Sequence, residues 1–345
     1  MGAGEIDKFS SLSQEALNRF IYVIGAARGG TTIIRKAIGI HDNILMLPGM
    51  THFMNQVWRY KNKIHDRLLR QIFRMPSFYG ESEVLRSPSE GSDLGKHIDR
   101  ALKGNNLRHM WQIYPLVYGL DKKNKKRPDQ ILCWGDKAND FYGIETVRRY
   151  FPKGKFIFVV RDPRAAVLSL ARRALRKEEH KIVKDVDDVK LIEASIHWRN
   201  MIQRMAYFSG RHPDRTIIVK FEDFLMTPEA TLNRIFRFTV GVPMDHDVIG
   251  KRLRDLTYGA SNEPEERGSG ISRKPIGRWK EALTQSQVET IAKLAGQTAF
   301  KIGYMPDGSL SLADFIQIIK RVNSLKQKVI ITAKLAYLQA FEAVI

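Results

Sequence analysis

Residues 20–40 read FIYVIGAARGGTTIIRKAIGI, which is an apolar run, a loop of small residues and a helical pattern. The run at 20–24 is uncharged and rich in aromatic and β-branched residues, as is typical of a strand buried on both faces. Residues 25–30 form the loop, and a helix is expected over 31–40. A strand, a glycine-containing loop and a helix in this order predict the anion-binding turn of an α/β protein.

The chemistry of this loop favours an anionic ligand. Its small residues let the backbone wrap around an anion, while Arg28 adds a positive charge and Thr31 and Thr32 add hydroxyl donors. A P-loop NTPase and an ordinary glycine-rich turn are the alternatives. Gly25 and Gly30 have P-loop spacing, but Thr31 stands where that motif requires lysine. We therefore expect anion binding without ATP hydrolysis.

Two further apolar runs also predict strands, a second buried one at 155–160 and a third strand at 216–220. Helical patterns follow them at 165–176 and 228–239, the second after a turn. Strands that are almost continuously apolar and alternate with helices indicate a parallel sheet covered on both faces. The predicted fold class is α/β, with a P-loop-like central parallel sheet flanked by helices, a helical insertion and a helical C-terminal tail.

The remaining segments predict how the chain is organised around this sheet. One domain is expected over 15–310, and the polar, basic pattern at 55–127 predicts a helical insertion for acceptor recognition or for a lid. Residues 121–128 read as a charged loop, and 261–274 as a mobile surface loop. The tail at 311–345 is helical with basic positions, and is expected to dock on the domain or on a partner subunit. Peripheral membrane contact through this basic helix is the alternative.

Charge and cysteine usage narrow the function classes. The chain has 57 Lys and Arg against 37 Asp and Glu, a formal net charge of +20, which concentrates anionic partners around it. Zinc-finger spacing and repeated aromatic platforms are missing, so the sequence disfavours a nucleic-acid partner. The single cysteine, Cys133, excludes an internal disulfide and lies among apolar residues, which predicts a buried thiol. The sequence has neither a secretory signal pattern nor the ~20 apolar residues of a spanning helix, so a cytoplasmic protein is expected.

A second motif lies at 160–169, VRDPRAAVLS, where the chain leaves a strand and enters a helix. Pro163 suits the first helical turn, where its missing N–H has no partner to lose. Arg161 offers a two-pronged donor to a phosphate, and Ser169 adds a hydroxyl two turns later. The alternative is that Arg161 pairs with Asp162 or another acid at the helix start.

Together these motifs resemble the sulfotransferases that use 3′-phosphoadenosine 5′-phosphosulfate (PAPS). Residues 27–32 are similar to the family's Arg-Ser-Gly-Thr-Thr loop, with Gly29 in place of Ser. Arg35 and His41 fall where the tyrosylprotein and carbohydrate branches, the closest in motifs, carry Arg and His-Pro; Asp42 replaces that Pro. Eukaryotic Golgi members of this family normally carry a membrane anchor. This sequence shows no such anchor, so a bacterial origin is expected.

The resemblance implies how a nucleotide would be held. The loop would bind the 5′-phosphosulfate, and Arg161 and Ser169 the 3′-phosphate. Phe221 replaces the Tyr of the family's Tyr-Glu-Asp-Leu segment and would contact adenine by stacking alone. For Trp198, packing in the core is preferred over a contact with adenine. Residues 272–280 resemble the late Gly-Arg-Trp segment and would fold over the nucleotide, a solvated basic loop being the alternative. The nucleotide contacts implied are Ala27, Arg28, Gly29, Gly30, Thr31, Thr32, Arg161, Ser169, Phe221, Arg273, Lys274 and Arg278.

Sulfuryl transfer needs cations beside the developing charge and a base for the acceptor. The resemblance assigns the first task to Arg28 and Lys137. Lys137 is expected just past a strand at 130–133, with a surface salt bridge to Asp136 as the alternative. No carboxylate stands where the tyrosylprotein branch has its catalytic Glu, so His52 is the candidate base. The lesser candidates are Glu81, Glu83 and His109.

Glu222 and Asp223 can be read as catalytic carboxylates, but capping of the next turn or pairing with basic helices is preferred.

The favoured function is metal-independent transfer of a sulfuryl group from PAPS to an acceptor hydroxyl, on a glycan, a lipid-linked sugar or a small metabolite. The product nucleotide is adenosine 3′,5′-bisphosphate. A nucleotide-dependent kinase, which requires ATP and Mg²⁺, is the leading alternative. A non-catalytic basic protein that binds nucleic acid or membrane by charge is the second.

Overall fold

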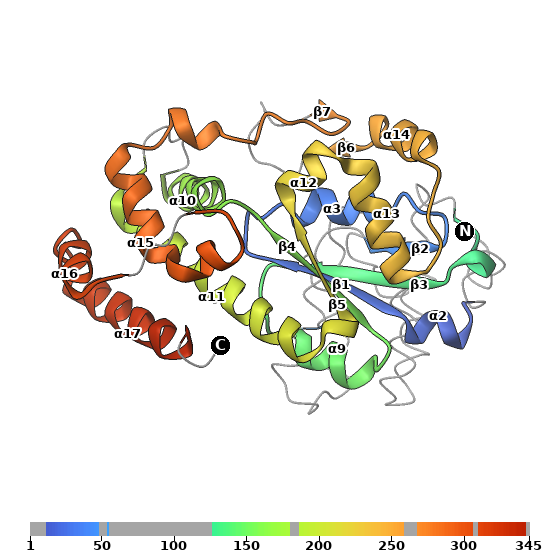
Figure 1. The fold of residues 1–345 in the computed structure, drawn as a ribbon, viewed down its shortest axis with the longest axis horizontal. Coiled ribbons are helices and arrows are strands. Elements are labelled where there is room, and N and C mark those ends of the chain that lie inside the picture. The colour runs from blue at the N-terminus through green and yellow to red at the C-terminus, as the bar shows by residue number, and fades with distance from the viewer. Residues whose placement is uncertain are drawn as a thin grey trace, which may run out of the picture.

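The centre of the protein is a parallel five-stranded sheet in the order β2-β3-β1-β4-β5 (Figure 1). The computed structural model describes residues 12–47, 54, 126–179, 186–258, 268–305 and 310–342. The strands are β1 (Phe20–Gly25), β2 (Ile44–Met46), β3 (Cys133–Ala138), β4 (Lys155–Val160) and β5 (Thr216–Lys220). The predicted α/β fold class with a central parallel sheet is confirmed.

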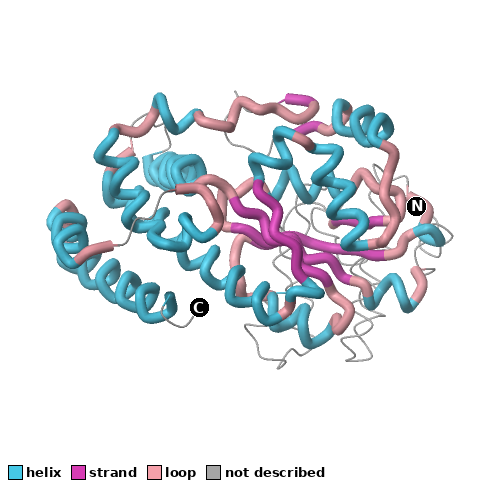
Figure 2. Tube along the Cα trace, viewed as in Figure 1, coloured by secondary structure: helices cyan, strands magenta, loops and turns pink. Residues whose placement is uncertain are grey.

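Helices cover both faces of this sheet (Figure 2). One face packs against α3 (Thr31–Ile38), α12 (Phe221–Met226), α13 (Pro228–Thr239) and α14 (His246–Arg254). The other packs against α2 (Gln14–Asn18), α9 (Ile144–Tyr150), α10 (Pro163–Glu179), α11 (Asp188–Arg211) and α15 (Gln285–Lys301). The short remaining elements are η1 (Pro128–Gln130), η2 (Pro213–Arg215), β6 (Thr257–Tyr258), β7 (Gly268–Ser269) and η4 (Arg278–Glu281).

Burial on both faces explains why β1 reads as an unbroken apolar run. In β1, Tyr22 and Ile24 enter the core beneath α10 and α11, whereas Ile21 and Val23 enter the core beneath α3 and α13. All four are at most 2% exposed. Because neither face of the strand meets water, the alternation of apolar and polar residues is absent.

Two sequence predictions about local structure are wrong. The strand expected at 130–133 is β3, Cys133–Ala138, because pairing with β1 runs from Phe20↔Trp134 to Ile24↔Ala138. The turn expected after β5 is the helix α12. Phe221, Phe224 and Leu225 repeat at helical spacing and are buried, which explains why this short segment coils.

The C-terminal tail forms α16 (Leu312–Lys320) and α17 (Leu325–Glu342). Ile331 and Leu335 of α17 pack in a small core with Ile192 and Ile196 of α11. The tail therefore docks on its own chain, one of the two placements expected for it (Figure 1).

The described residues include no helix with the length and apolar character needed to cross a bilayer. The predicted insertion lies outside them except for its last two residues, and so does the first half of the loop expected at 261–274. The division into a domain over 15–310 and a tail stays a prediction.

Candidate active site

The loop between β1 and α3 has an unusual backbone. Arg28 has φ 67°, the left-handed region that few residues other than glycine adopt. Gly30 has φ 93° and occupies the N-cap of α3 without a side chain to cap it. A strained residue beside an uncapped helix start is typical of a ligand site, because the first N–H groups of the helix face outward there.

Both glycines of the loop are required by close contacts. A Cβ added at Gly30 would lie 2.2 Å from the Phe221 ring, and one at Gly29 would lie 2.8 Å from the Ala26 carbonyl oxygen. Gly29 N–H also donates to that oxygen at 2.8 Å, which closes a tight turn. The replacement of the family's Ser by Gly29 therefore has a local cause.

Three residues predicted from two separate motifs meet beside this loop. Arg28 Nε donates to Ser169 Oγ at 2.8 Å, and Arg161 Nη1 donates to the Arg28 carbonyl oxygen at 3.0 Å. Asp162, the acid considered as a partner for Arg161, forms its ion pair with Arg164 at 2.7 Å. Two guanidinium groups at the positive end of the α3 dipole are an arrangement that an anion stabilises.

Phe221 lies under the loop. Its side chain is 5% exposed, and the Arg161 guanidinium carbon lies 5.0 Å from the ring centroid. Trp198 is 1% exposed and donates its indole N–H to the Arg161 carbonyl oxygen at 3.0 Å. The preference for core packing of Trp198 is confirmed, and the adenine contact of Phe221 stays a prediction.

The end of β3 joins the site through a hydroxyl. Thr31 Oγ1 donates to Asn139 Oδ1 at 2.8 Å, so Asn139 connects the end of β3 to the start of α3. Lys137 lies inside β3 at 6% exposure and Asp136 is 1% exposed, so the alternative of a surface salt bridge is wrong. Strand alternation places Lys137 on the face of Cys133, which α3 covers.

Burial raises the pKa of the Cys133 thiol to about 12, as expected of an inert buried cysteine.

His197 is a site residue that the sequence did not reveal. It lies on α11, and its Nε2 accepts a hydrogen bond of 3.5 Å from Ala27 N–H of the loop. Burial lowers the pKa of His197, the Lys334 charge adds to this effect and the Asp140 charge opposes it. A lone histidine in a helical pattern has no spacing signal, so only the fold could reveal it.

The late basic segment makes its contacts along the loop after β7. Arg273 Nη2 donates to the Met226 carbonyl oxygen at 3.1 Å, and the Ser272 hydroxyl accepts from Lys274 N–H at 3.2 Å. The side chains of Arg273, Lys274 and Arg278 are exposed. Trp279 lies against the Arg164 guanidinium, 4.0 Å from its carbon. The phosphate contacts of Arg273, Lys274 and Arg278 stay predictions, as does that of the half-buried Thr32.

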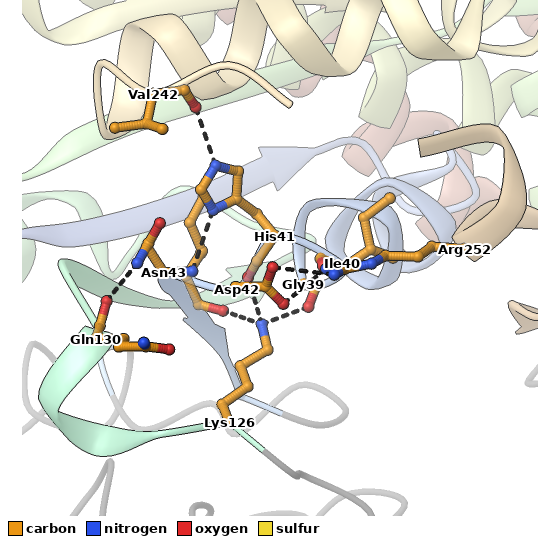
Figure 3. A network of polar contacts seen from close by, with 10 residues as sticks. Gly39, Ile40, His41, Asp42, Asn43, Lys126, Gln130, Val242 and Arg252 are labelled. Atoms are coloured by element: carbon orange, nitrogen blue, oxygen red, sulfur yellow. Dashed lines mark hydrogen bonds and ion pairs between the residues drawn. The ribbon is translucent and has the colours of Figure 1, made fainter. Parts of the chain in front are cut away.

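The opposite end of α3 holds a second polar network (Figure 3). Lys126 Nζ donates to the carbonyl oxygens of Gly39, His41 and Ile44. His41 accepts from Asn43 N–H through Nδ1 at 3.1 Å, so its Nε2 carries the proton and donates to the Val242 carbonyl oxygen at 2.9 Å. Burial lowers the pKa of His41, which keeps the ring neutral.

The neighbouring Arg35 is 5% exposed and donates to the Leu47 carbonyl oxygen at 2.7 Å. Arg35 and His41, the tail of the loop motif, thus hold backbone in place. The candidate base His52 and the lesser candidates Glu81, Glu83 and His109 lie outside the described residues.

The geometry defines an α/β protein with a strained, arginine-containing loop at the carboxyl edge of a parallel sheet, where this architecture usually binds its ligand. The profile of the sulfotransferase family matches residues 21–246, which include the loop, Arg161, Ser169 and Phe221. The chain belongs to the sulfotransferase family.

Individual relatives agree with the family match. A putative protein-tyrosine sulfotransferase of Caenorhabditis elegans is 26% identical over 194 residues, 53% of this chain and 68% of the relative. Protein-tyrosine sulfotransferase 1 of Danio rerio is 21% identical over 294 residues, 83% of this chain and 72% of the relative. The fold is similar to that of a sulfotransferase domain from the curacin biosynthetic pathway, with a TM-score of 0.51 and 16% identity. That alignment covers 83% of this chain and 98% of that domain.

Proposed function

We propose that the protein transfers a sulfuryl group from PAPS to an acceptor hydroxyl. The observation that carries the proposal is the meeting of Arg28, Arg161 and Ser169 at the N-terminus of α3. Two arginines delivered by different strand ends suit a ligand with two separate anionic groups, such as a 5′-phosphosulfate and a 3′-phosphate. A ligand with one phosphate chain would not need both positions.

The transfer itself breaks the bond between the sulfate sulfur and the bridging oxygen of the donor and forms one between sulfur and the acceptor oxygen. Adenosine 3′,5′-bisphosphate leaves, and the acceptor proton passes to a base. Arg28, Lys137 and the loop N–H groups stabilise the charge on the leaving oxygen and on the equatorial oxygens. His52 is the proposed base; His52→Ala should abolish turnover and leave nucleotide affinity nearly unchanged.

The acceptor belongs to the proposal as well. Sugar hydroxyls, on glycans, lipid-linked sugars or small metabolites, are the acceptors expected from the sequence. The relatives named protein-tyrosine sulfotransferases add the phenolic hydroxyl of tyrosine. Labelled sulfate transfer to a panel of sugars and tyrosine peptides would identify the class. The cytoplasmic location and peripheral membrane contact remain proposals too.

Calorimetry would test the donor site. At moderate salt, adenosine 3′,5′-bisphosphate should bind at least about 10-fold tighter than ADP or ATP, because a charge-assisted pair with Arg161 is worth about 1.5–3 kcal/mol. Arg161→Gln should remove most of this preference and leave ADP affinity nearly unchanged. Equal binding of ADP and the bisphosphate would reject the proposal. A kinase would instead prefer ATP with Mg²⁺, and a charge-driven binder would lose all nucleotides together as salt rises.

A further inference from the structure

The carboxyl end of β4 is held by side chains from three other elements. Trp198 of α11 donates to the Arg161 carbonyl oxygen at 3.0 Å. Glu222 of α12 accepts from Asp162 N–H through Oε1 at 3.1 Å. The Tyr304 hydroxyl lies 3.2 Å from the Val160 carbonyl oxygen. Trp198 and Glu222 therefore fix the backbone at Arg161 and Asp162 from outside the strand, and the Tyr304 hydroxyl adjoins it at Val160.

Tyr304 and Glu222 act together in this arrangement. The Tyr304 hydroxyl donates to Glu222 Oε2 at 2.5 Å, and a single hydroxyl proton is directed mainly to this shorter, charge-assisted contact. Burial raises the pKa of Tyr304, and the Glu222 charge raises it further, so the hydroxyl remains a donor at all working pH values. Glu222 thus has one oxygen on the β4 backbone and the other on Tyr304. It is a structural carboxylate, as the sequence analysis preferred.

The position of Tyr304 is itself fixed. Gly303 has φ 72° in the turn after α15, and Tyr304 N–H donates to the Ala299 carbonyl oxygen at 3.0 Å. Arg164 Nη2 donates to the Tyr304 carbonyl oxygen at 3.4 Å while pairing with Asp162. Tyr304 is therefore connected to the residue after Arg161 by two routes, one through Glu222 and one through Arg164.

We infer that Tyr304, acting through Glu222, is a positioning residue that aims Arg161 at the 3′-phosphate and so sets selectivity for a 3′-phosphorylated nucleotide. The inference rests on the proposed function. The guanidinium of Arg161 lies between the loop carbonyl of Arg28 and the Phe221 ring, so a small rotation of the β4 end displaces it from both. Tyr304 lies beyond the residues matched by the family profile, which end at 246.

The experiment compares two nucleotides that differ only at the 3′ position. Calorimetric Kd values are measured for adenosine 3′,5′-bisphosphate and for adenosine 5′-monophosphate. Tyr304→Phe should weaken the bisphosphate about 5- to 10-fold and change the monophosphate less than about 2-fold. Tyr337→Phe is the matched control, since it also removes a phenolic oxygen, one that accepts from Arg204 on α11, and it should change neither value.

Glu222→Gln provides a second variant with the same shape. Glutamine replaces one carboxylate oxygen with an NH2 group that can only donate. The charge-assisted hydrogen bond from the Tyr304 hydroxyl to Glu222 is therefore lost, and the same selective weakening of the bisphosphate is expected. In turnover assays both variants should raise the KM for the donor and leave kcat nearly unchanged, because Arg161 holds ground state and transition state alike.

The outcomes separate the two proposals. A wild-type protein with no preference for the bisphosphate rejects the proposed function itself. A wild-type preference that survives unchanged in both variants overturns the inference about Tyr304. Parallel weakening of both nucleotides, or a loss of kcat with unchanged KM, overturns it as well, because either would show a general structural role. Thermal unfolding of each variant confirms that folded protein is compared.

Discussion

The two ends of helix α3 differ in how their charges are satisfied. At the C-terminal end, the Lys126 ammonium donates to the carbonyl oxygens of Gly39, His41 and Ile44, at the end of the helix and just after it. At the N-terminal end, Gly30 provides no side-chain cap. Arg28 and Arg161 lie at this end, where the helix dipole is also positive. A cation stabilises a helix C-terminus and opposes its N-terminus.

This difference teaches which end is built for stability and which for a ligand. The chain supplies the counter-charge for the C-terminal end itself, and the neutral His41 and the pair between Asp42 and Arg252 complete the network (Figure 3). The N-terminal end has two arginines at a strained backbone, and the proposed function places the anionic nucleotide there. Substitutions of the charged side chains at the two ends should therefore separate stability from binding.

The largest difference is expected between the two glycines that flank α3. Gly30→Ala introduces a Cβ at φ 93° that overlaps the Phe221 ring, and should lower the free energy of unfolding by about 4 kcal/mol through left-handed strain and overpacking. Gly39 has φ −65°, and its added Cβ would lie 3.2 Å from the Lys36 carbonyl oxygen, so Gly39→Ala should cost about 0.5 kcal/mol. Urea unfolding measures both. Equal losses would contradict the difference between the ends.

We call the C-terminal end of α3 the closed end, because the chain supplies its counter-charge. The pH dependence of the free energy of unfolding tests the role of Lys126 there. Burial lowers its pKa to about 8, from an ordinary value of 10.5. Between these values the unfolded chain binds a proton at Lys126 and the folded chain does not, so this group makes folding more favourable as pH rises. The wild-type advantage over Lys126→Met should be about 1 kcal/mol at pH 7, from lost hydrogen bonds to carbonyl oxygens, and should widen by about 2 kcal/mol by pH 9.5.

Lys326→Met, on the exposed start of α17, is the matched control for this experiment, and its difference from wild type should not change with pH. If the difference in unfolding free energy between wild type and Lys126→Met narrowed as pH rises, the folded protein would hold the charged ammonium in preference to the neutral amine. Nucleotide affinity should be unchanged in Lys126→Met, since the substitution lies at the far end of the helix from Arg28.

The sequence predicted the parts of the fold whose signal is local. The strands at 155–160 and 216–220 have the predicted bounds because each is a continuous apolar run. The bounds of β3 were missed because Asp136 and Lys137 look exposed to a pattern of apolar residues, whereas the pairing with β1 buries them. Lys126, in a run of charges expected to be a loop, is half-buried for a similar reason: the acceptors of its protons belong to residues 39–44.

The site divides in the same way. Arg28, Arg161 and Ser169 could be predicted because each belongs to a strand-to-helix motif, and parallel strands bring their carboxyl ends to one edge. His197 and Tyr304 could not, because each is a single residue in or after a helix whose neighbours are chosen by packing. Their contacts with the loop and with β4 exist only once α11 and α15 lie on the sheet.

The smallest effect is expected at the surface of the closed end. Asp42 accepts two hydrogen bonds from Arg252, at 2.7 and 3.0 Å, but is 63% exposed, so Asp42→Asn should cost only about 0.5 kcal/mol and less at high salt. The hydrogen bond from Arg252 lowers the pKa of Asp42, so its contribution is present above the unfolded pKa and is lost as pH falls through the folded one. Asp129→Asn, which breaks the local pair with Arg127, is the control for an exposed carboxylate in a different ion pair.

Nucleotide affinity decides whether the two ends of α3 are independent. Asp42→Asn leaves the net charge one unit more positive, an effect that Asp129→Asn reproduces at another surface position. Any change in the Kd of adenosine 3′,5′-bisphosphate should therefore be the same in both variants and should disappear as salt is raised. A salt-resistant loss of affinity confined to Asp42→Asn would mean that the turn after α3 transmits strain along the helix to Gly30. In that case the closed end would be part of the binding site rather than its support.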